Sequence, residues 1–277
     1  MTAGPRAPAA PPFGPAPFLI AGPCVLEDDG LNLRVAERLA ALGAKLGLPV
    51  VYKASFDKAN RARLAGFRGP GLGTGLAALA RVRAATGLPV LTDVHEPAQA
   101  AEAAAVADVL QVPAFLCRQT DLLVAVGRTG RPVNIKKGQW MTPEGMAGAV
   151  EKVRSAGGGA VAVTERGTFF GYGDLVVDMR SFARLRAACG TPVVFDGTHS
   201  VQQPGRGADG ASGGQRECIP ALLRAAAAAG ADGFFLETHP DPDHAPSDGP
   251  NMIPLADLEG VVARALDVWR AARGPHD

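Results

Sequence analysis

The sequence of 277 residues has few cysteines and almost no net charge. Its 4 cysteines are scattered without a Cys-x-x-Cys pair, which excludes a disulfide framework and fits a reducing, cytoplasmic compartment. Lys and Arg total 28 against 27 Asp and Glu, and we find no local basic patch, so we expect no nucleic-acid or membrane partner. No apolar run reaches the ~20 residues of a membrane span. A small-molecule partner is therefore expected.

The first 17 residues are almost entirely Ala, Pro and Gly. This composition buries too little apolar surface to offset the entropy of ordering, so residues 1–17 are predicted to form a mobile tail. The apolar run at 18–21 is too short for a signal-peptide core, and a soluble, unprocessed protein is expected. The rest of the chain, 18–277, is long enough for one large α/β domain.

Eight short Val-rich runs alternate with Ala- and Leu-rich stretches of helical period. The predicted strands are 18–21, 50–55, 90–94, 109–114, 133–137, 160–165, 193–198 and 233–238. The predicted helices are 31–46, 74–86, 96–107, 119–129, 142–156, 178–188, 215–229 and 255–272. Continuous apolar strands are typical of a parallel sheet buried on both faces. Eight such units predict a single (β/α)8 TIM barrel. The alternative is an open doubly wound sheet, whose usual dinucleotide fingerprint is absent.

Polar side chains gather where the predicted strands end, which is where active sites of (β/α)8 barrels lie. Strand by strand they are Cys24; Lys53, Ser55 and Lys58; Asp93 and His95; Gln111 and Arg118; Lys136, Lys137 and Gln139; Glu165 and Arg166; Asp196 and His199; Glu237 and His239, with Asp248 beyond. The opposite strand ends carry mainly Gly, Leu and Pro. Randomly placed charges would fall at both ends, so this asymmetry predicts an active site.

Cations form one part of this set, namely Lys53, Lys58, Arg61, Lys136 and Arg166, with Arg118 as a further candidate. Cations that converge on one barrel mouth repel each other unless an anionic ligand compensates them. Arg and Lys are also the usual phosphate ligands. We therefore expect a multiply charged, phosphorylated substrate. The alternative, solvated loop charges, is disfavoured because Lys53 and Lys136 lie inside apolar strands.

A thiol, an imidazole and two carboxylates form the other part: Cys24, His199, Glu237 and Asp248. They come from the first, seventh and eighth predicted strands and their ends, and these strands become neighbours when a barrel closes. Mixed sulfur, nitrogen and oxygen ligands suit Fe2+, Zn2+, Mn2+ or Co2+ better than Mg2+ or Ca2+. The sequence therefore predicts one divalent transition metal ion. Cys24 alone would more simply be a small buried hydrophobe, but its place after Gly22-Pro23 at a strand end favours a metal ligand.

At these residues the sequence resembles the 3-deoxy-D-manno-octulosonate 8-phosphate synthases, also called 2-dehydro-3-deoxyphosphooctonate aldolases. The resemblance runs from about Phe18 to Leu266 and rests on IAGPC (20–24), YKASFDKANR (52–61), RGPGLG (68–73), TDVHEP (92–97), QVPAFLCRQTDLL (111–123), IKKGQ (135–139), TERGTFFGYGDLVVDMRS (164–181), DGTHSVQ (196–202), ASGGQRE (211–217) and ETHPDPDHAPSDGP (237–250). It implies a barrel, usually a homotetramer, that condenses phosphoenolpyruvate with D-arabinose 5-phosphate in lipopolysaccharide biosynthesis and releases inorganic phosphate.

The resemblance also implies residue roles. Phosphoenolpyruvate would be bound by Lys58, Lys136, Arg166, Ser55 and Gln111 with the backbone near Ala114, and the pentose phosphate by Asn60 and Arg61, with Arg118 reaching in from a neighbouring subunit. We expect Lys58, Asp93, Lys136 and His199 to act in catalysis, and Lys53 and Gln139 to contribute to substrate binding. A Cys at position 24 accompanies the metal-dependent members, whereas an Asn accompanies the metal-free ones. Cys24 therefore implies the metal-dependent class.

One departure from the resembled family lies directly after Arg61. Members commonly continue with Ser-Ser, and this chain has Ala62-Arg63, so a hydroxyl contact to the sugar phosphate is missing and Arg63 is a candidate substitute. The nearest alternative is a 3-deoxyheptulosonate 7-phosphate synthase using erythrose 4-phosphate, against which KANR (58–61) argues because that family usually shows a KPRT-like stretch. A sialic-acid-type synthase is more distant. A non-catalytic sugar-phosphate-binding barrel would need the cations but not the predicted metal ligands.

Overall fold

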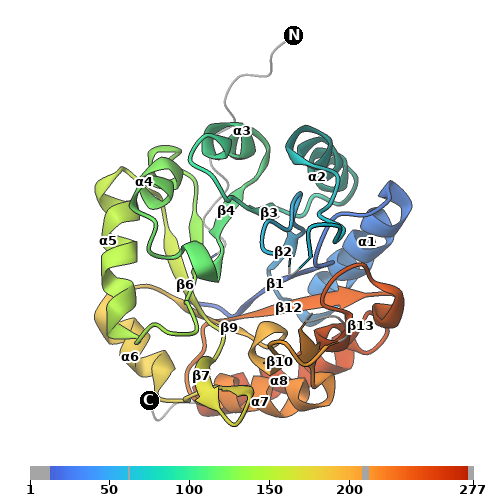
Figure 1. Ribbon diagram of the computed structural model, residues 1–277. Coiled ribbons are helices and arrows are strands. Elements are labelled where there is room, and N and C mark those ends of the chain that lie inside the picture. Colours follow the sequence, from blue (N-terminus) through green and yellow to red (C-terminus); the bar gives the residue numbers. More distant parts are fainter. Residues whose placement is uncertain (1–12, 62, 208–211, 274–277) are drawn as a thin grey trace.

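A closed barrel of parallel strands forms the centre of the computed structural model, which describes residues 13–61, 63–207 and 212–273 (Figure 1). Around the barrel, in order, lie β1 (Phe18–Gly22), β2 (Val50–Lys53), β3 (Val90–Asp93), β4 (Val109–Val112), β5 (Val133–Lys136), β6 (Val161–Glu165), β9 (Val193–Asp196) and β12 (Gly233–His239). The barrel closes where β1 pairs with β12, in register from Phe18 opposite Gly233 to Gly22 opposite Glu237.

Helices connect successive strands and cover the barrel from outside. They are α1 (Asp29–Leu46), α2 (Leu72–Thr86), α3 (Gln99–Val106), α4 (Thr120–Arg128), α5 (Ala147–Ser155), α6 (Ser181–Cys189), α7 (Ile219–Ala228) and α8 (Leu258–Ala272). Local sequence explains some boundaries: Asp28 caps α1 by accepting a hydrogen bond from the Leu31 amide, and Gly47 ends it in a left-handed conformation. The predicted (β/α)8 barrel is confirmed, and each predicted strand and helix overlaps an observed one.

The barrel interior has two tiers, because side chains alternate between the two faces of each strand. The tier at the amino-terminal strand ends is apolar and contains Ile20, Val51, Leu91, Val109, Ala162, Val194 and Phe235. Two residues further along six of these strands, the interior positions are polar: Lys53, Asp93, Gln111, Thr164, Asp196 and Glu237. The strands therefore supply a rigid apolar floor beneath a buried polar layer.

Phe13 and Phe18 extend the apolar floor of the barrel at its amino-terminal end. Both are buried, and their ring centroids lie 5.5 Å apart. Phe13 belongs to the segment 1–17 that the sequence predicted to be a mobile tail, so the structure gives part of that segment a place in the core. Residues 1–12 lie outside the described residues, and the division into tail and barrel stays a prediction.

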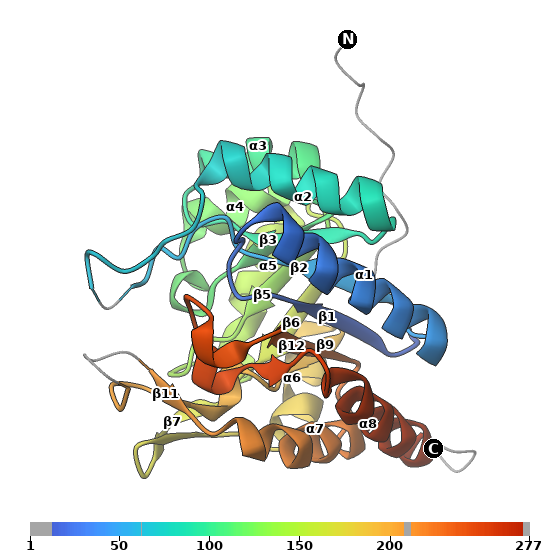
Figure 2. The same ribbon diagram turned by 90° about the vertical axis from the view of Figure 1, so that its right-hand side faces the viewer.

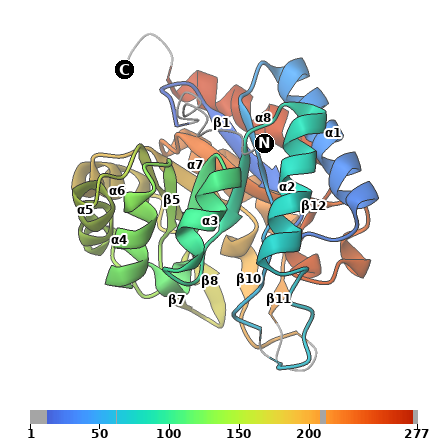
Figure 3. The ribbon, with the colours of Figure 1, turned by 90° about the horizontal axis from the view of Figure 1, so that it is seen from above.

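Short strands lie in the loops at the carboxyl ends of the barrel strands. They are β7 (Thr168–Gly171) with β8 (Asp174–Val176), β10 (Gln202–Gln203) with β11 (Gly213–Gly214), and β13 (Ile253–Pro254), which pairs with β12. The first two pairs extend from the same side of the molecule as the loop after β2 (Figures 2 and 3). The sequence did not predict them, because two to four residues carry too little periodicity. No helix within the described ranges is both long and apolar enough to cross a membrane.

Candidate active site

A cavity of about 700 Å³ opens at the carboxyl ends of the barrel strands. The predicted site residues that line it are Lys53, Lys58, Asn60, Arg61, Asp93, Gln111, Ala114, Lys136, Gln139, Arg166, His199 and Asp248. Cys24, Ser55 and Glu237 are buried in contact with these residues, whereas Arg118 is exposed and does not line the cavity. The structure thus brings the predicted residues together, with Arg118 as the exception.

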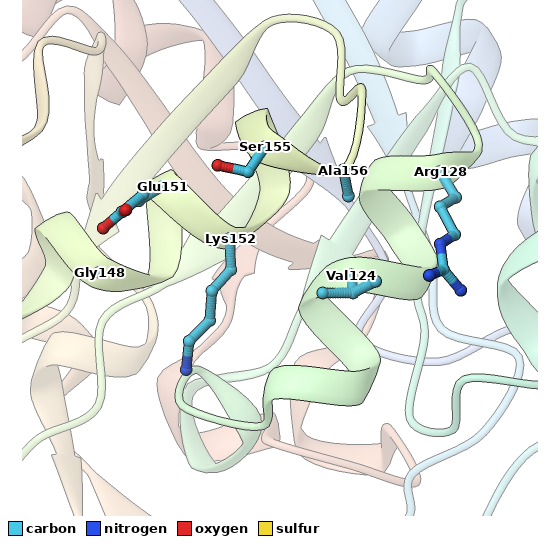
Figure 4. Close-up of a pocket in the computed structure, with 7 residues that line it drawn as sticks. All are labelled: Val124, Arg128, Gly148, Glu151, Lys152, Ser155 and Ala156. Atoms are coloured by element: carbon cyan, nitrogen blue, oxygen red, sulfur yellow. The ribbon is translucent and has the colours of Figure 1, made fainter.

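A second hollow lies on the outer wall of the barrel, between α4 and α5 (Figure 4). Its lining contains none of the predicted site residues and consists of Val124, Arg128, Gly148, Glu151, Lys152, Ser155 and Ala156. Lys152 is already engaged there, because its Nζ donates a 2.8 Å hydrogen bond to Thr120 Oγ1. The cavity at the strand ends is therefore the candidate active site.

Cys24 is placed by the close approach of β1 and β2. A Cβ on Gly22 would lie 2.0 Å from the Lys53 carbonyl oxygen, so only glycine fits before Pro23 and Cys24. Cys24, Glu237 and Asp248 each offer a ligand atom, and these atoms lie within 4.8 Å of one another. The Cys24 Sγ lies 3.1 Å from Asp248 Oδ2.

The orientation of His199 places one ring nitrogen beside this cluster. Nδ1 lies 2.8 Å from Asp196 Oδ2, and because a carboxylate only accepts hydrogen bonds, Nδ1 carries the proton. Nε2 is the ring nitrogen left to face the cluster, 3.7 Å from Glu237 Oε2 and 3.9 Å from Asp248 Oδ2. His199 therefore lies beside two of the three clustered residues, Glu237 and Asp248.

The electrostatics of the cluster suit a cation. Burial, reinforced by Glu237, holds the pKa of the Cys24 thiol well above its usual range. Burial would also raise the pKa of Glu237, but Lys53 and His199 hold it below its usual value. The pKa of Asp248 is likewise low, because His199 and Lys58 outweigh burial. Glu237 Oε2 is buried without a hydrogen-bond partner. A divalent ion would supply that partner and favour the thiolate.

Buried cations face the cluster across the cavity. Lys136 Nζ lies 2.5 Å from Asp196 Oδ2 and 3.0 Å from the centroid of the Phe235 ring. Burial lowers the pKa of Lys136 to about 8, although Asp196 opposes the shift. Arg166 donates from Nη2 to Gln202 Oε1 at 2.7 Å, but its buried Nη1 has no partner. Gln139 Oε1 is likewise buried without a partner.

The loop after β2 carries the other cations. Lys58 Nζ lies 4.0 Å from Glu237 Oε1. Arg61 donates to the Phe67 carbonyl oxygen at 2.7 Å and to Ser247 Oγ at 2.8 Å, so it connects this loop to the one that carries Asp248. Asn60 and Arg63 line the cavity beside it. This rim is more exposed than the Lys136 side and suits a ligand's outer end.

Two residues that the sequence did not single out complete the polar layer. Asn134 Nδ2 donates to Gln111 Oε1 at 2.8 Å, and Thr164 Oγ1 donates to Asn134 Oδ1 at 2.7 Å. Gln111 in turn donates from Nε2 to Asp93 Oδ1 at 2.5 Å, and Ser55 donates to the other Asp93 oxygen. A signal was available: Asn134 lies two residues before Lys136, on the same face of β5.

A buried ion pair anchors the loops after β5 and β6 behind the cavity. Lys137 Nζ lies 3.5 Å from Glu165 Oε1 and donates to the carbonyl oxygens of Gly138 and Gly167 at 3.3 Å and 3.2 Å. Glu165 Oε1 accepts the Gly167 amide at 2.7 Å. Because the neighbours of this pair in sequence include Gln139 and Arg166, the pair fixes the backbone that presents them to the cavity.

Two other predicted polar residues lie apart from the cavity. His239 is buried, and its Nε2 lies 3.1 Å from Glu27 Oε1. Arg118 follows a 3-10 helix (Ala114–Leu116) in which Phe115 is half exposed and stacks on Trp140 at 6.1 Å between ring centroids. Arg118 and Trp140 are exposed, and Phe115 lines the cavity at its rim.

Comparisons with known proteins agree with this architecture. A profile of the DAHP synthetase I family matches residues 14–267. A 2-dehydro-3-deoxyphosphooctonate aldolase of Bradyrhizobium sp. strain BTAi1 is 54% identical over 257 residues, covering 93% of this chain and 90% of that protein. Its namesake in Rhodopseudomonas palustris strain HaA2 is 56% identical over 249 residues, covering 90% and 86%. The Nitrosococcus oceani protein of that name is 58% identical over 245 residues, covering 88% and 87%. The chain therefore belongs to the DAHP synthetase I family and, within it, to the family of the 2-dehydro-3-deoxyphosphooctonate aldolases.

Proposed function

We propose that this protein condenses phosphoenolpyruvate with D-arabinose 5-phosphate and water to give 3-deoxy-D-manno-octulosonate 8-phosphate and inorganic phosphate, a step of lipopolysaccharide biosynthesis. The observation that carries the proposal is the buried Arg166 Nη1, which has no partner in a cavity that Lys136 shares. A buried donor without a partner is costly unless a ligand supplies the acceptor. The name shared by the curated relatives favours the eight-carbon product over the seven-carbon one.

The buried side of the cavity suits phosphoenolpyruvate. Lys136 and Arg166 supply two positive charges, and the Arg166 fork matches the spacing of phosphate or carboxylate oxygens. Gln111 reaches the same cavity and donates from its amide nitrogen. We assign these residues, with Lys58 and the backbone near Ala114, to phosphoenolpyruvate, and Gln139 and Lys53 to its surroundings.

The exposed rim suits the phosphate of the pentose. Asn60 and Arg61 line it, and Arg63 stands where the resembled family has a hydroxyl residue. An aldehyde at the inner end of the sugar would then face C3 of the enol. The main contribution of the protein is to hold the aldehyde carbon and C3 of the enol close together in the orientation for attack.

We further propose that one divalent transition ion, Fe2+, Zn2+, Mn2+ or Co2+, is bound by Cys24, His199, Glu237 and Asp248. The mixed donor set and the Glu237 Oε2 that has no hydrogen-bond partner support this site. When bound, such an ion supplies a Lewis acid for the aldehyde or for the attacking water. Asp196 keeps His199 in the tautomer that exposes the Nε2 lone pair.

The chemistry then proceeds in two additions and one cleavage. C3 of the enol attacks the aldehyde carbon, and water adds to C2. The resulting hemiketal phosphate expels inorganic phosphate by cleavage of its C–O bond. Lys136, with a pKa of about 8, can hold a proton at Nζ near neutral pH while it binds the substrate anion, and Asp93 stays ionised.

We also propose a homotetramer in the cytoplasm. The exposed Arg118 and the half-exposed stacked pair Phe115 and Trp140 support association, since a neighbouring subunit would bury the rings and receive the cation. The four cysteines are free, which suits a reducing compartment. Light scattering of the purified protein tests the mass of the assembly.

An acceptor panel tests the proposed reaction. The purified protein is incubated with phosphoenolpyruvate and either arabinose 5-phosphate or erythrose 4-phosphate, and the products are identified by mass. We expect arabinose 5-phosphate to be preferred by ~100-fold or more in kcat/KM, because a phosphate misplaced by one carbon misaligns the aldehyde. Equal use of both sugars contradicts this acceptor assignment. Absence of any phosphate release indicates a binding protein instead.

A further inference from the structure

We propose that Asn134 and Thr164 are positioning residues that fix the orientation of the Gln111 side-chain amide, so that its remaining N–H faces the substrate anion. This inference rests on the proposed function, because it assigns the anion to phosphoenolpyruvate. It rests on a continuous chain of hydrogen bonds that crosses four strands, from Thr164 on β6 through Asn134 and Gln111 to Asp93 on β3.

The polarity of this chain is set at its Asp93 end. Asp93 is ionised, since Lys53 and Lys58 outweigh burial and hold its pKa below the usual range, and a carboxylate can only accept. Gln111 must therefore turn Nε2 toward Asp93 and Oε1 toward Asn134. Asn134 must then donate from Nδ2, which leaves its Oδ1 to accept from the Thr164 hydroxyl. Each residue is fixed by the next.

Burial prevents the hydrogen-bond chain from adopting another arrangement. Asn134 and Thr164 have no solvent-exposed surface, and Gln111 has 2%. Water cannot replace a lost partner at such positions. A reversed Gln111 amide would set two acceptors against each other at Asp93 and two donors against each other at Asn134. The register supports this, because Gln111 lies directly opposite Asp93 on β3 and Asn134 on β5.

The functional consequence concerns the second hydrogen on Gln111 Nε2. Asp93 uses one N–H, and the residue also lines the cavity, so the other N–H can donate to a phosphate or carboxylate oxygen. A reversed amide would present lone pairs to the anion instead. Asn134 and Thr164, which do not line the cavity, thereby act on substrate affinity through Gln111.

Two substitutions test the chain with little change of volume. Thr164→Val removes only the hydroxyl donor, and Asn134→Asp replaces the donating amide by a carboxylate that accepts. The new carboxylate would draw Gln111 Nε2 away from Asp93. The measured quantities are the Kd of phosphoenolpyruvate by calorimetry, which needs no acceptor sugar, and KM for each substrate together with kcat.

We expect Asn134→Asp to weaken phosphoenolpyruvate binding by ~10-fold or more and Thr164→Val by several-fold, because each disturbs a charge-assisted or buried hydrogen bond. KM for arabinose 5-phosphate should change less than two-fold. Thr164→Ser, which restores the hydroxyl, should restore the affinity. The matched control is Thr92→Val, since the Thr92 hydroxyl is also fully buried on a barrel strand but has no hydrogen-bond partner.

Unchanged phosphoenolpyruvate affinity in folded Thr164→Val and Asn134→Asp proteins would overturn the inference. So would equal weakening in Thr92→Val or in Thr164→Ser, since these outcomes indicate a packing effect. If Asn134→Asp does not fold, the comparison of Val and Ser at position 164 decides alone. Wild-type protein that binds phosphoenolpyruvate but forms no product contradicts the proposed function and leaves the affinity test of this inference intact.

Discussion

Lys53 Nζ donates a 2.6 Å hydrogen bond to Oε1 of Glu237, and the other carboxylate oxygen of Glu237 is buried with no hydrogen-bond partner. Lys53 also donates to the Cys24 carbonyl oxygen at 2.9 Å. Lys53 thus holds the carboxylate of one predicted metal ligand, Glu237, and the backbone of another, Cys24. The Glu237 oxygen without a hydrogen bond suits a second positive partner. The first prediction concerns that partner.

Removal of the metal should abolish turnover. We expect a strong chelator to inactivate the protein, Mn2+, Co2+, Fe2+ or Zn2+ to restore activity, and Mg2+ to restore it poorly, because Cys24 is a soft ligand. Cys24→Ala should lower bound metal, measured by elemental analysis, and reduce kcat by at least ~10-fold. Cys189→Ala, on α6, is the control that keeps both. Full activity of metal-stripped protein contradicts this site.

Lys136 should impose an alkaline limb on the pH profile. Burial lowers its pKa to about 8, so the free enzyme loses this positive charge as pH rises through that value. The groups that face it are Asp196, Lys53 and Glu237. We expect kcat/KM for phosphoenolpyruvate to fall above pH ~8, and the limb in kcat to lie at higher pH, because a bound anion favours the protonated amine.

The limb is assigned by substitution. Lys136→Gln should have a low kcat/KM that no longer falls through this pH range, since its side chain does not titrate. A limb of unchanged position in that variant would assign the titration to another group.

Arg166 and Arg61 should affect different substrates. Arg166→Ala removes a buried charged donor, so we expect KM for phosphoenolpyruvate to rise ~10-fold or more while KM for the pentose phosphate changes little. Arg61→Ala should show the reverse pattern. Steady-state kinetics with each substrate varied in turn separate the two. The division of the cavity into two halves is wrong if either variant changes only the other substrate's KM.

The pair of Lys137 and Glu165 should matter for stability. Lys137→Met leaves the Glu165 carboxylate buried without its cation, and we expect a loss of about 3–5 kcal/mol in the free energy of unfolding. The double variant Lys137→Met with Glu165→Gln should lose less than the single one, because it buries no unpaired charge. Denaturant melts measure both. A double variant as unstable as the sum of its single variants would show that the two side chains do not interact.

The sequence predicted the barrel because each unit repeats the same buried strand and covering helix. The cavity-lining residues were predicted for a related reason. In this fold a residue at the carboxyl end of a barrel strand lies at the end of the barrel where the active site forms. Asn134 and Thr164 were not predicted as site residues, because a polar residue inside a Val-rich strand has no distinctive neighbour in sequence. Its partners lie on neighbouring strands that are distant in the chain. The burial of Phe13 was not predicted, because the prediction for residues 1–17 rested on the average composition of the segment and not on single residues.

The closure of the barrel through β1 and β12 has a consequence for how the protein is made. Cys24 follows β1, and Glu237 lies on β12, the strand that pairs with β1 to close the barrel. Most of the polypeptide lies between the two residues, so they can meet only after nearly the whole chain has been synthesised. A nascent chain on the ribosome cannot assemble the cluster early, and the last strand must find the first across this long separation. Incomplete chains therefore cannot form the proposed metal site, so uptake of the proposed ion would report completed folding.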